Sequence, residues 1–171
     1  IAGRLMGQFL GGTGKIAVVS SAIASENNNY YVQVRETEFA DFIHKEYPDI
    51  EIITTLDSFE DPQITYEKTV KLLRDYQDLQ GIYITCGGVS QVGRALEESG
   101  RAKDIRVISF EDYPEVVDLI RKDVIDCTLA GELQQQGEIP VQIIMDYLVF
   151  GKEPEQQQIF TDIRVLVKES L

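Results

Sequence analysis

The chain has 171 residues, of which 29 are acidic and 16 are basic, so its formal net charge at neutral pH is −13. A surface this acidic argues against a protein that itself grips the phosphate backbone of a nucleic acid. Two cysteines and one histidine are too few for a disulfide framework or a histidine-rich metal site. A hydrophobic content of 43% is that of an ordinary globular domain.

Helices and strands are expected to alternate along the whole chain, because apolar residues recur at helical spacing in some segments and form continuous runs in others. The predicted helices cover residues 1–10, 30–47, 63–77, 89–99, a segment that starts at Pro114, and 138–150. The predicted strands and extended segments cover residues 15–21, 50–56, 81–85, 105–110, 124–130 and 159–167. This order predicts an α/β fold, a three-layer sandwich with a mostly parallel sheet.

The start of the chain is unusual, since the first predicted helix begins at the first residue with no capping residue or turn before it. We therefore expect the chain to be a fragment of a longer protein.

The glycines at positions 11, 12 and 14 and Lys15 are similar to a phosphate-binding loop, but the spacing is wrong and Lys15 opens a strand instead of a helix. A helix stop followed by a turn is the simpler interpretation.

Residues 81–112 are the central unit of the predicted fold, since they read as strand, glycine turn, helix and strand. Two strands joined by one helix form a right-handed unit with parallel strands. Ligands of open parallel sheets bind beyond the carboxyl ends of the strands. Those ends are here Cys86-Gly87-Gly88 and Glu111-Asp112, where we expect a site.

Catalytic patterns are absent from the sequence. The single histidine, His44, lies on a polar helix flank and cannot serve a Ser-His-Asp or Cys-His arrangement. Cys86 and Cys127 lie in or beside predicted buried strands, which is typical of core thiols. Glu111 and Asp112 remain open as catalytic carboxylates, as Mg²⁺ ligands, as acceptors for ligand hydroxyls or as solvated groups. The sequence favours a binding module over an enzyme, with no cofactor and no metal.

Five motifs, in order, resemble the effector-binding domain of LacI/GalR-type transcription regulators, and more broadly the sugar-binding, periplasmic-binding-protein-like fold. They are Ala2-Gly3-Arg4-Leu5, the strand over 15–21, Arg35 to Phe39 as R-x-x-G-F with Glu38 in the place of the glycine, Val107 to Glu111 as V-I-G-F-D, and the segment from Gly131 through a helix to the ending over 154–165. The match covers almost the whole chain, but only the later part of such a domain.

The resemblance implies a cytoplasmic regulator whose two lobes close over a small effector, in most cases a carbohydrate. Residues 1–137 would be mainly the second lobe, residues 138–153 a helix that packs on a first lobe absent from the chain, and residues 154–171 a return segment. DNA would be bound only through a missing N-terminal domain, and the regulator would be a homodimer with no membrane contact. Arg35 would donate paired hydrogen bonds to the effector, and Glu111 would accept them from its hydroxyls. From the residues alone, a surface ion pair of Arg35 with Glu38 is an alternative.

Two departures from the family pattern concern the binding site. The family often has Asn where this chain has Gly87, and Gln where it has Gly131, so two polar contacts are expected to be missing. Glu132, Asn29 or Tyr30 are the candidates to replace them, although a tyrosine within a helix can equally be core.

Two other functions remain open. The chain could belong to a solute-binding protein of a carbohydrate ABC transporter, which is exported and makes no DNA contact. It could also be a carboxylate-dependent enzyme that uses Glu111 and Asp112.

Overall fold

The computed structural model describes residues 1–21 and 30–171. A six-stranded sheet has the order β2-β1-β3-β4-β5-β6, and all neighbours pair in parallel except β5 and β6, which are antiparallel. The strands are β1 (Thr13–Ser20), β2 (Asp49–Asp57), β3 (Leu79–Ile84), β4 (Arg106–Phe110), β5 (Cys127–Gly131) and β6 (Ile163–Leu166). The mostly parallel α/β fold predicted from the sequence is confirmed.

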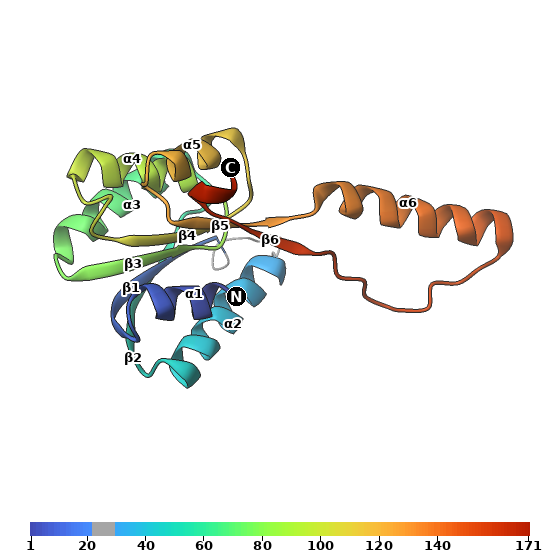
Figure 1. The fold of residues 1–171 in the computed structure, drawn as a ribbon, viewed down its shortest axis with the longest axis horizontal. Helices are drawn as coiled ribbons and strands as arrows, with labels where there is room; N and C mark the ends of the chain where they lie inside the picture. The colour runs from blue at the N-terminus through green and yellow to red at the C-terminus, as the bar shows by residue number, and fades with distance from the viewer. Residues whose placement is uncertain (22–29) are drawn as a thin grey trace.

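Helices cover both faces of this sheet (Figure 1). One face carries α1 (Ala2–Phe9) and α2 (Tyr30–Glu46), and the other carries α3 (Pro62–Asp75), α4 (Val89–Ser99) and α5 (Pro114–Arg121). Each face has its own apolar core: Met6, Phe39 and Ile43 pack on the first, and Leu72, Val92 and Leu119 on the second. The sheet is therefore buried on both sides, as parallel sheets require.

Glycines and short polar residues fix the ends of the helices. Gly88 and Gly100 flank α4 with φ of 94° and 70°, a backbone region open to glycine without strain. The side chain of Asp61 accepts a hydrogen bond from the backbone N–H of Ile64 at the start of α3, where Pro62 occupies the first turn. These local signals explain why the bounds of α4 agree with the prediction.

The last helix, α6 (Leu133–Phe150), differs from the prediction in its start and its environment. It begins at Leu133 instead of residue 138, so the expected polar connection up to Gly137 is largely helical. Glutamines are good helix formers, and they outweigh the cost of Gly137 and Pro140 inside the helix. In Figure 1, α6 and the segment that returns from it project away from the sheet.

None of the residues in α6 is buried, although much of its surface is apolar. The exposed apolar side chains on and after it include Val141, Ile144, Leu148, Phe150 and Phe160. No helix among the described residues is long and apolar enough to cross a membrane. The short 3₁₀ helix η1 (Lys168–Ser170) ends the chain.

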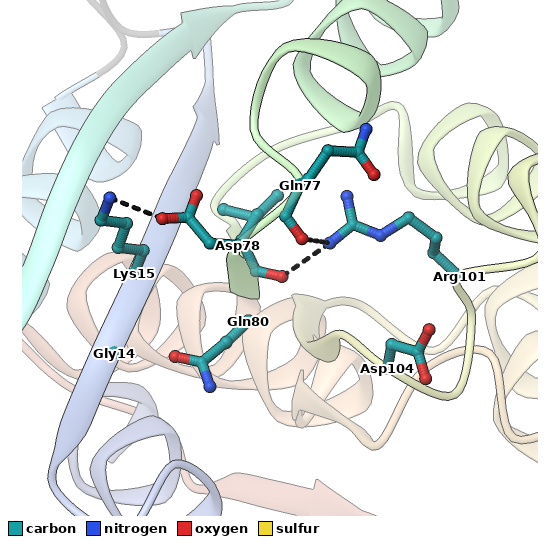
Figure 2. A pocket seen from close by; sticks show the side chains of 8 residues that line it. Gly14, Lys15, Gln77, Asp78, Gln80, Arg101 and Asp104 are labelled. Atoms are coloured by element: carbon teal, nitrogen blue, oxygen red, sulfur yellow. Dashed lines mark hydrogen bonds and ion pairs between the residues drawn. The ribbon is translucent and has the colours of Figure 1, made fainter.

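The opposite edge of the sheet, where strands begin, is held by Arg101. Its guanidinium donates to the backbone carbonyls of Leu73, Tyr76, Gln77 and Leu79 at 2.9–3.0 Å, as Figure 2 shows in part. These carbonyls belong to the end of α3 and the start of β3, so Arg101 joins α4 to both. Arg101, Lys15 and Asp78 line one hollow at this edge, where Lys15 and Asp78 form an ion pair of 2.6 Å. The charged groups of Arg101, Lys15 and Asp78 in this hollow are thus engaged in contacts within the chain.

Replacing Arg101 by methionine should lower the free energy of unfolding by about 2–3 kcal/mol, because four carbonyls lose a charged donor. Arg121→Met is the matched control, since Arg121 makes only an exposed ion pair with Asp118 among the described residues. Its cost should stay below about 1 kcal/mol. Urea unfolding followed by circular dichroism measures both, and equal losses would contradict a special role for Arg101.

Candidate functional site

The candidate site lies at the carboxyl edge of the sheet, where the parallel strands β1, β3, β4 and β5 all end. Residues directly beyond these ends are Ser21, Thr85 to Gly87, Glu111 and Glu132. Because neighbouring strands are parallel, these positions share one edge. This is the edge that the sequence predicted.

Arg35 lies one turn and a half into α2 and reaches back to this edge. Its guanidinium carbon stands 3.8 Å from the centre of the Phe110 ring, and one nitrogen donates to the backbone carbonyl of Thr85 at 3.1 Å. A second nitrogen lies 3.9 Å from a carboxylate oxygen of Glu111. The charged partner is thus Glu111, directly after β4, and the alternative of an ion pair with Glu38 has no counterpart among the described contacts.

The distance between Arg35 and Glu111 has a chemical consequence. A gap of 3.9 Å is an ion pair but is too long for a hydrogen bond. The two side chains are 30% and 32% exposed, so both still reach solvent at the cleft. The guanidinium of Arg35 and the carboxylate of Glu111 therefore lie side by side, and they do not use up one another's hydrogen bonds.

The ring under Arg35 is supported from the core. Phe110 is tilted against Tyr83 with ring centres 6.5 Å apart, and Tyr83 stacks on Phe39 at 4.2 Å. Burial raises the pKa of Tyr83, so its phenol stays neutral in this apolar column. A guanidinium on a fixed aromatic face has little freedom to move, which is the arrangement that a preorganised binding group needs.

The backbone of Glu111 is in the left-handed region, with φ of 74°. This conformation is unfavourable for a residue with a side chain. Two bonds to β5 hold it: the N–H of Glu111 donates to the carbonyl of Leu129 at 3.0 Å, and the hydroxyl of Thr128 donates to the carbonyl of Glu111 at 2.6 Å. Strain of this kind gathers at functional sites, where it aims a side chain that the strand alone would direct elsewhere.

Two hollows meet at Arg35, Phe110 and Glu111. The smaller, of about 500 Å³, extends to Cys86, Gly87 and the start of α4. The larger, of about 900 Å³, extends along α6 and the segment that returns from it. Their volumes suit a small molecule, and the four residues that line both hollows are Val32, Arg35, Phe110 and Glu111.

The other predicted site residues lie in different places. Gly87 lines the smaller hollow, and a side-chain carbon added there would meet nothing within 4 Å. Tyr30 is 63% exposed and touches the edge of the Tyr31 ring. Asn29 lies outside the described residues. Tyr31 is 73% exposed and lines the larger hollow, whereas Val32, Phe39 and Ile43 form the buried face of α2.

Glu132 is engaged away from Arg35. Its carboxylate lies 2.5 Å from Arg164 on β6, and the same guanidinium lies 3.3 Å from Asp112. This triad joins the ends of β4 and β5 to the strand that returns from α6. Glu132 is thus paired with Arg164, and its contact with a ligand stays a prediction.

Among the described residues, no reactive thiol and no metal-binding cluster is assembled at this edge. Burial raises the pKa of the Cys86 thiol, which also lies 3.5 Å from the hydroxyl of Ser58, so the thiol is protonated at neutral pH. Within residues 1–21 and 30–171, no cluster of His, Cys, Asp and Glu has the arrangement of a metal site. What the edge offers is hydrogen bonding and an aromatic face.

The sequence of the chain matches the model of one protein family, described as periplasmic binding protein domain, over residues 1–153. The chain belongs to this family. A comparison with curated protein sequences gave no match. The family assignment agrees with the broader resemblance drawn from the motifs.

Solved structures show the same fold. GanP, a glucose-galactose binding protein from Geobacillus stearothermophilus, is 22% identical with a TM-score of 0.86 and is matched by 99% of this chain. A sugar-binding protein of a sugar ABC transporter from Bacillus halodurans is 27% identical, with a TM-score of 0.83 over 98% of this chain. An ABC transporter solute-binding protein from Burkholderia graminis, in complex with D-arabinose, is 22% identical with a TM-score of 0.86. This periplasmic binding protein domain spans 59% of the length of the first two structures.

The strain at Glu111 can be separated from its charge. Glu111→Gln removes the charge but keeps a side chain on the left-handed backbone, whereas Glu111→Gly removes the side chain as well. The free energy of unfolding of the glycine variant should therefore be about 1 kcal/mol higher than that of the glutamine variant. Thermal and urea unfolding of the two variants measure this difference. A glutamine variant as stable as the glycine variant would show that position 111 carries no strain.

Proposed function

We propose that the chain binds a small carbohydrate and forms part of a solute-binding protein of a sugar uptake system. The observation that carries this proposal is the convergence of Arg35, Phe110 and Glu111 at the carboxyl edge of the sheet. The neighbour at 27% identity is a sugar-binding protein of an ABC transporter, which supports the same function.

The chemistry of the edge suits a sugar. A sugar hydroxyl both donates and accepts hydrogen bonds, so it can accept from the guanidinium of Arg35 and donate to the carboxylate of Glu111. The planar guanidinium presents parallel donors that match two neighbouring hydroxyls. The role of the site is binding, with no chemical step.

A second wall for this site is part of the proposal. The neighbouring structures are longer than this chain, and α6 exposes apolar residues with no partner in the chain described here. We infer that a preceding lobe covers the helix over 138–153 and faces Arg35 across the cleft, while residues 1–137 and the return segment over 154–171 form the other lobe. The broad exposed apolar surface of α6 then has a physical reason.

The LacI/GalR-type regulator is the second candidate, favoured by the five ordered motifs, among them Ala2-Gly3-Arg4-Leu5. It would bring a DNA-binding domain, a homodimer and a cytoplasmic location. The solved structures named above are sugar-binding and transport proteins, so they support the uptake function better. Cell fractionation discriminates the two: export supports uptake, and retention in the cytoplasm supports regulation.

Arg35→Lys should weaken sugar binding by about tenfold or more, because lysine cannot present two parallel donors from a fixed aromatic face. Titration calorimetry of the full-length gene product with D-glucose, D-galactose, D-arabinose and D-fucose measures the affinity. Arg94→Lys is the matched control, since Arg94 also stacks on an aromatic ring, that of Tyr66 at 4.5 Å, and pairs with Glu98. Equal affinities of the two variants, or no sugar binding by the wild-type protein, would overturn the proposal.

A further inference from the structure

Gly131, the last residue of β5, has no side chain that could contact a ligand. A carbon added to it would lie 2.6 Å from the side-chain nitrogen of Gln136, closer than such a carbon can stand. The amide of Gln136 therefore already occupies the space into which a side chain at position 131 would extend. A side chain at position 131 would therefore have to displace the amide of Gln136.

Gln136 reaches this space from the first turn of α6, and two contacts hold it there. Its backbone N–H donates to the carbonyl of Glu132 at 3.0 Å, and its side-chain nitrogen lies 3.4 Å from the hydroxyl of Thr161 on the returning segment. Thr161 is adjacent to Asp162, whose carbonyl accepts from the N–H of Glu132 at 3.3 Å. The amide thus sits between the two chain segments that cross from the sheet to α6.

The position of Gln136 relative to the candidate site follows from the sheet. Leu129 on β5 pairs with Phe110 on β4, and Gly131 lies two residues beyond Leu129 at the end of β5. Gln136, Arg35, Phe110 and Glu111 line the same hollow of about 900 Å³. An amide offers both a donor and an acceptor, which matches the two roles of a hydroxyl.

We propose that Gln136 is a ligand-contacting, specificity-determining residue, whose amide supplies from α6 the polar contact that a side chain at position 131 would supply from β5. This inference rests on the proposed function, with a carbohydrate hydroxyl as the group contacted. The amide replaces one of the two contacts that the sequence indicated as missing, and Glu132, the neighbour considered for that role, is held by Arg164.

Calorimetry of the full-length gene product, with whichever of D-glucose, D-galactose, D-arabinose and D-fucose binds the wild-type protein, tests the proposal. Gln136→Ala should lower the affinity about tenfold. Gln134→Ala is the matched control, because Gln134 is in the same turn but bonds to Glu138 at 2.7 Å and does not line this hollow. Its affinity should equal that of the wild-type protein.

Moving the amide from position 136 to position 131 separates a ligand contact from a structural role, because only a ligand contact predicts that sugar affinity is restored. Gly131→Gln alone should weaken binding, because the new side chain and Gln136 compete for one space. Combined with Gln136→Ala it should restore most of the affinity lost in the alanine variant, so the two substitutions are strongly non-additive. The order of preference among the four sugars should change in the alanine variant.

The outcomes separate this inference from the function on which it rests. Sugar binding that falls in Arg35→Lys but is equal in Gln136→Ala and Gln134→Ala overturns the role of Gln136 alone. A loss in Gln136→Ala that the added Gly131→Gln does not relieve also overturns it. Absence of sugar binding by the wild-type protein overturns both. Circular dichroism checks that each variant is folded, which the exposure of Gln136 leads us to expect.

Discussion

The contact of the Arg35 guanidinium with the Phe110 ring organises the carboxyl edge of the sheet. It depends on parts of the chain far apart in sequence: α2 supplies the arginine, β4 the ring, and the residue after β3 the carbonyl of Thr85 that accepts from the guanidinium. Behind the ring, Tyr83 and Phe39 carry the aromatic contacts into the core. Arg35 is thus anchored to the buried core of the sheet, and its guanidinium lies 3.9 Å from Glu111.

Beside this layer, the chain leaves the sheet and returns to it. Arg164 pairs with Glu132 and Asp112 and so ties the returning strand β6 to the ends of β5 and β4. Past this triad the chain leaves the sheet, runs along α6 and comes back, with apolar side chains exposed along the way (Figure 1). A fixed crossing next to the binding residues is what a two-lobed protein needs if closure is to place both walls around one ligand.

The strands of the sheet and the bounds of most helices could be predicted from local signals, because glycines, prolines and short polar caps act within a few residues. The unit over 81–112 could be predicted for this reason, and so could its edge as a site. Long-range partners could not: the position of Phe110 under Arg35 and the capture of Glu132 by Arg164 depend on packing between distant segments. The start of α6 was misplaced because Gly137 and Pro140 usually mark a boundary, yet Pro140 here only deprives the carbonyl of Gln136 of one donor. The buried face of α2 could not be predicted from spacing, because Tyr31 and Val32 are adjacent and only the contact with the sheet selects Val32.

If Arg35 and Glu111 hold one ligand together on the face built by Phe110, a crystal structure of the full-length gene product with its bound sugar will show both contacts. A guanidinium nitrogen of Arg35 and a carboxylate oxygen of Glu111 should each lie about 2.7–3.0 Å from oxygens of the same sugar. A sugar bound elsewhere, with Arg35 still paired only to Thr85 and Glu111, would contradict it.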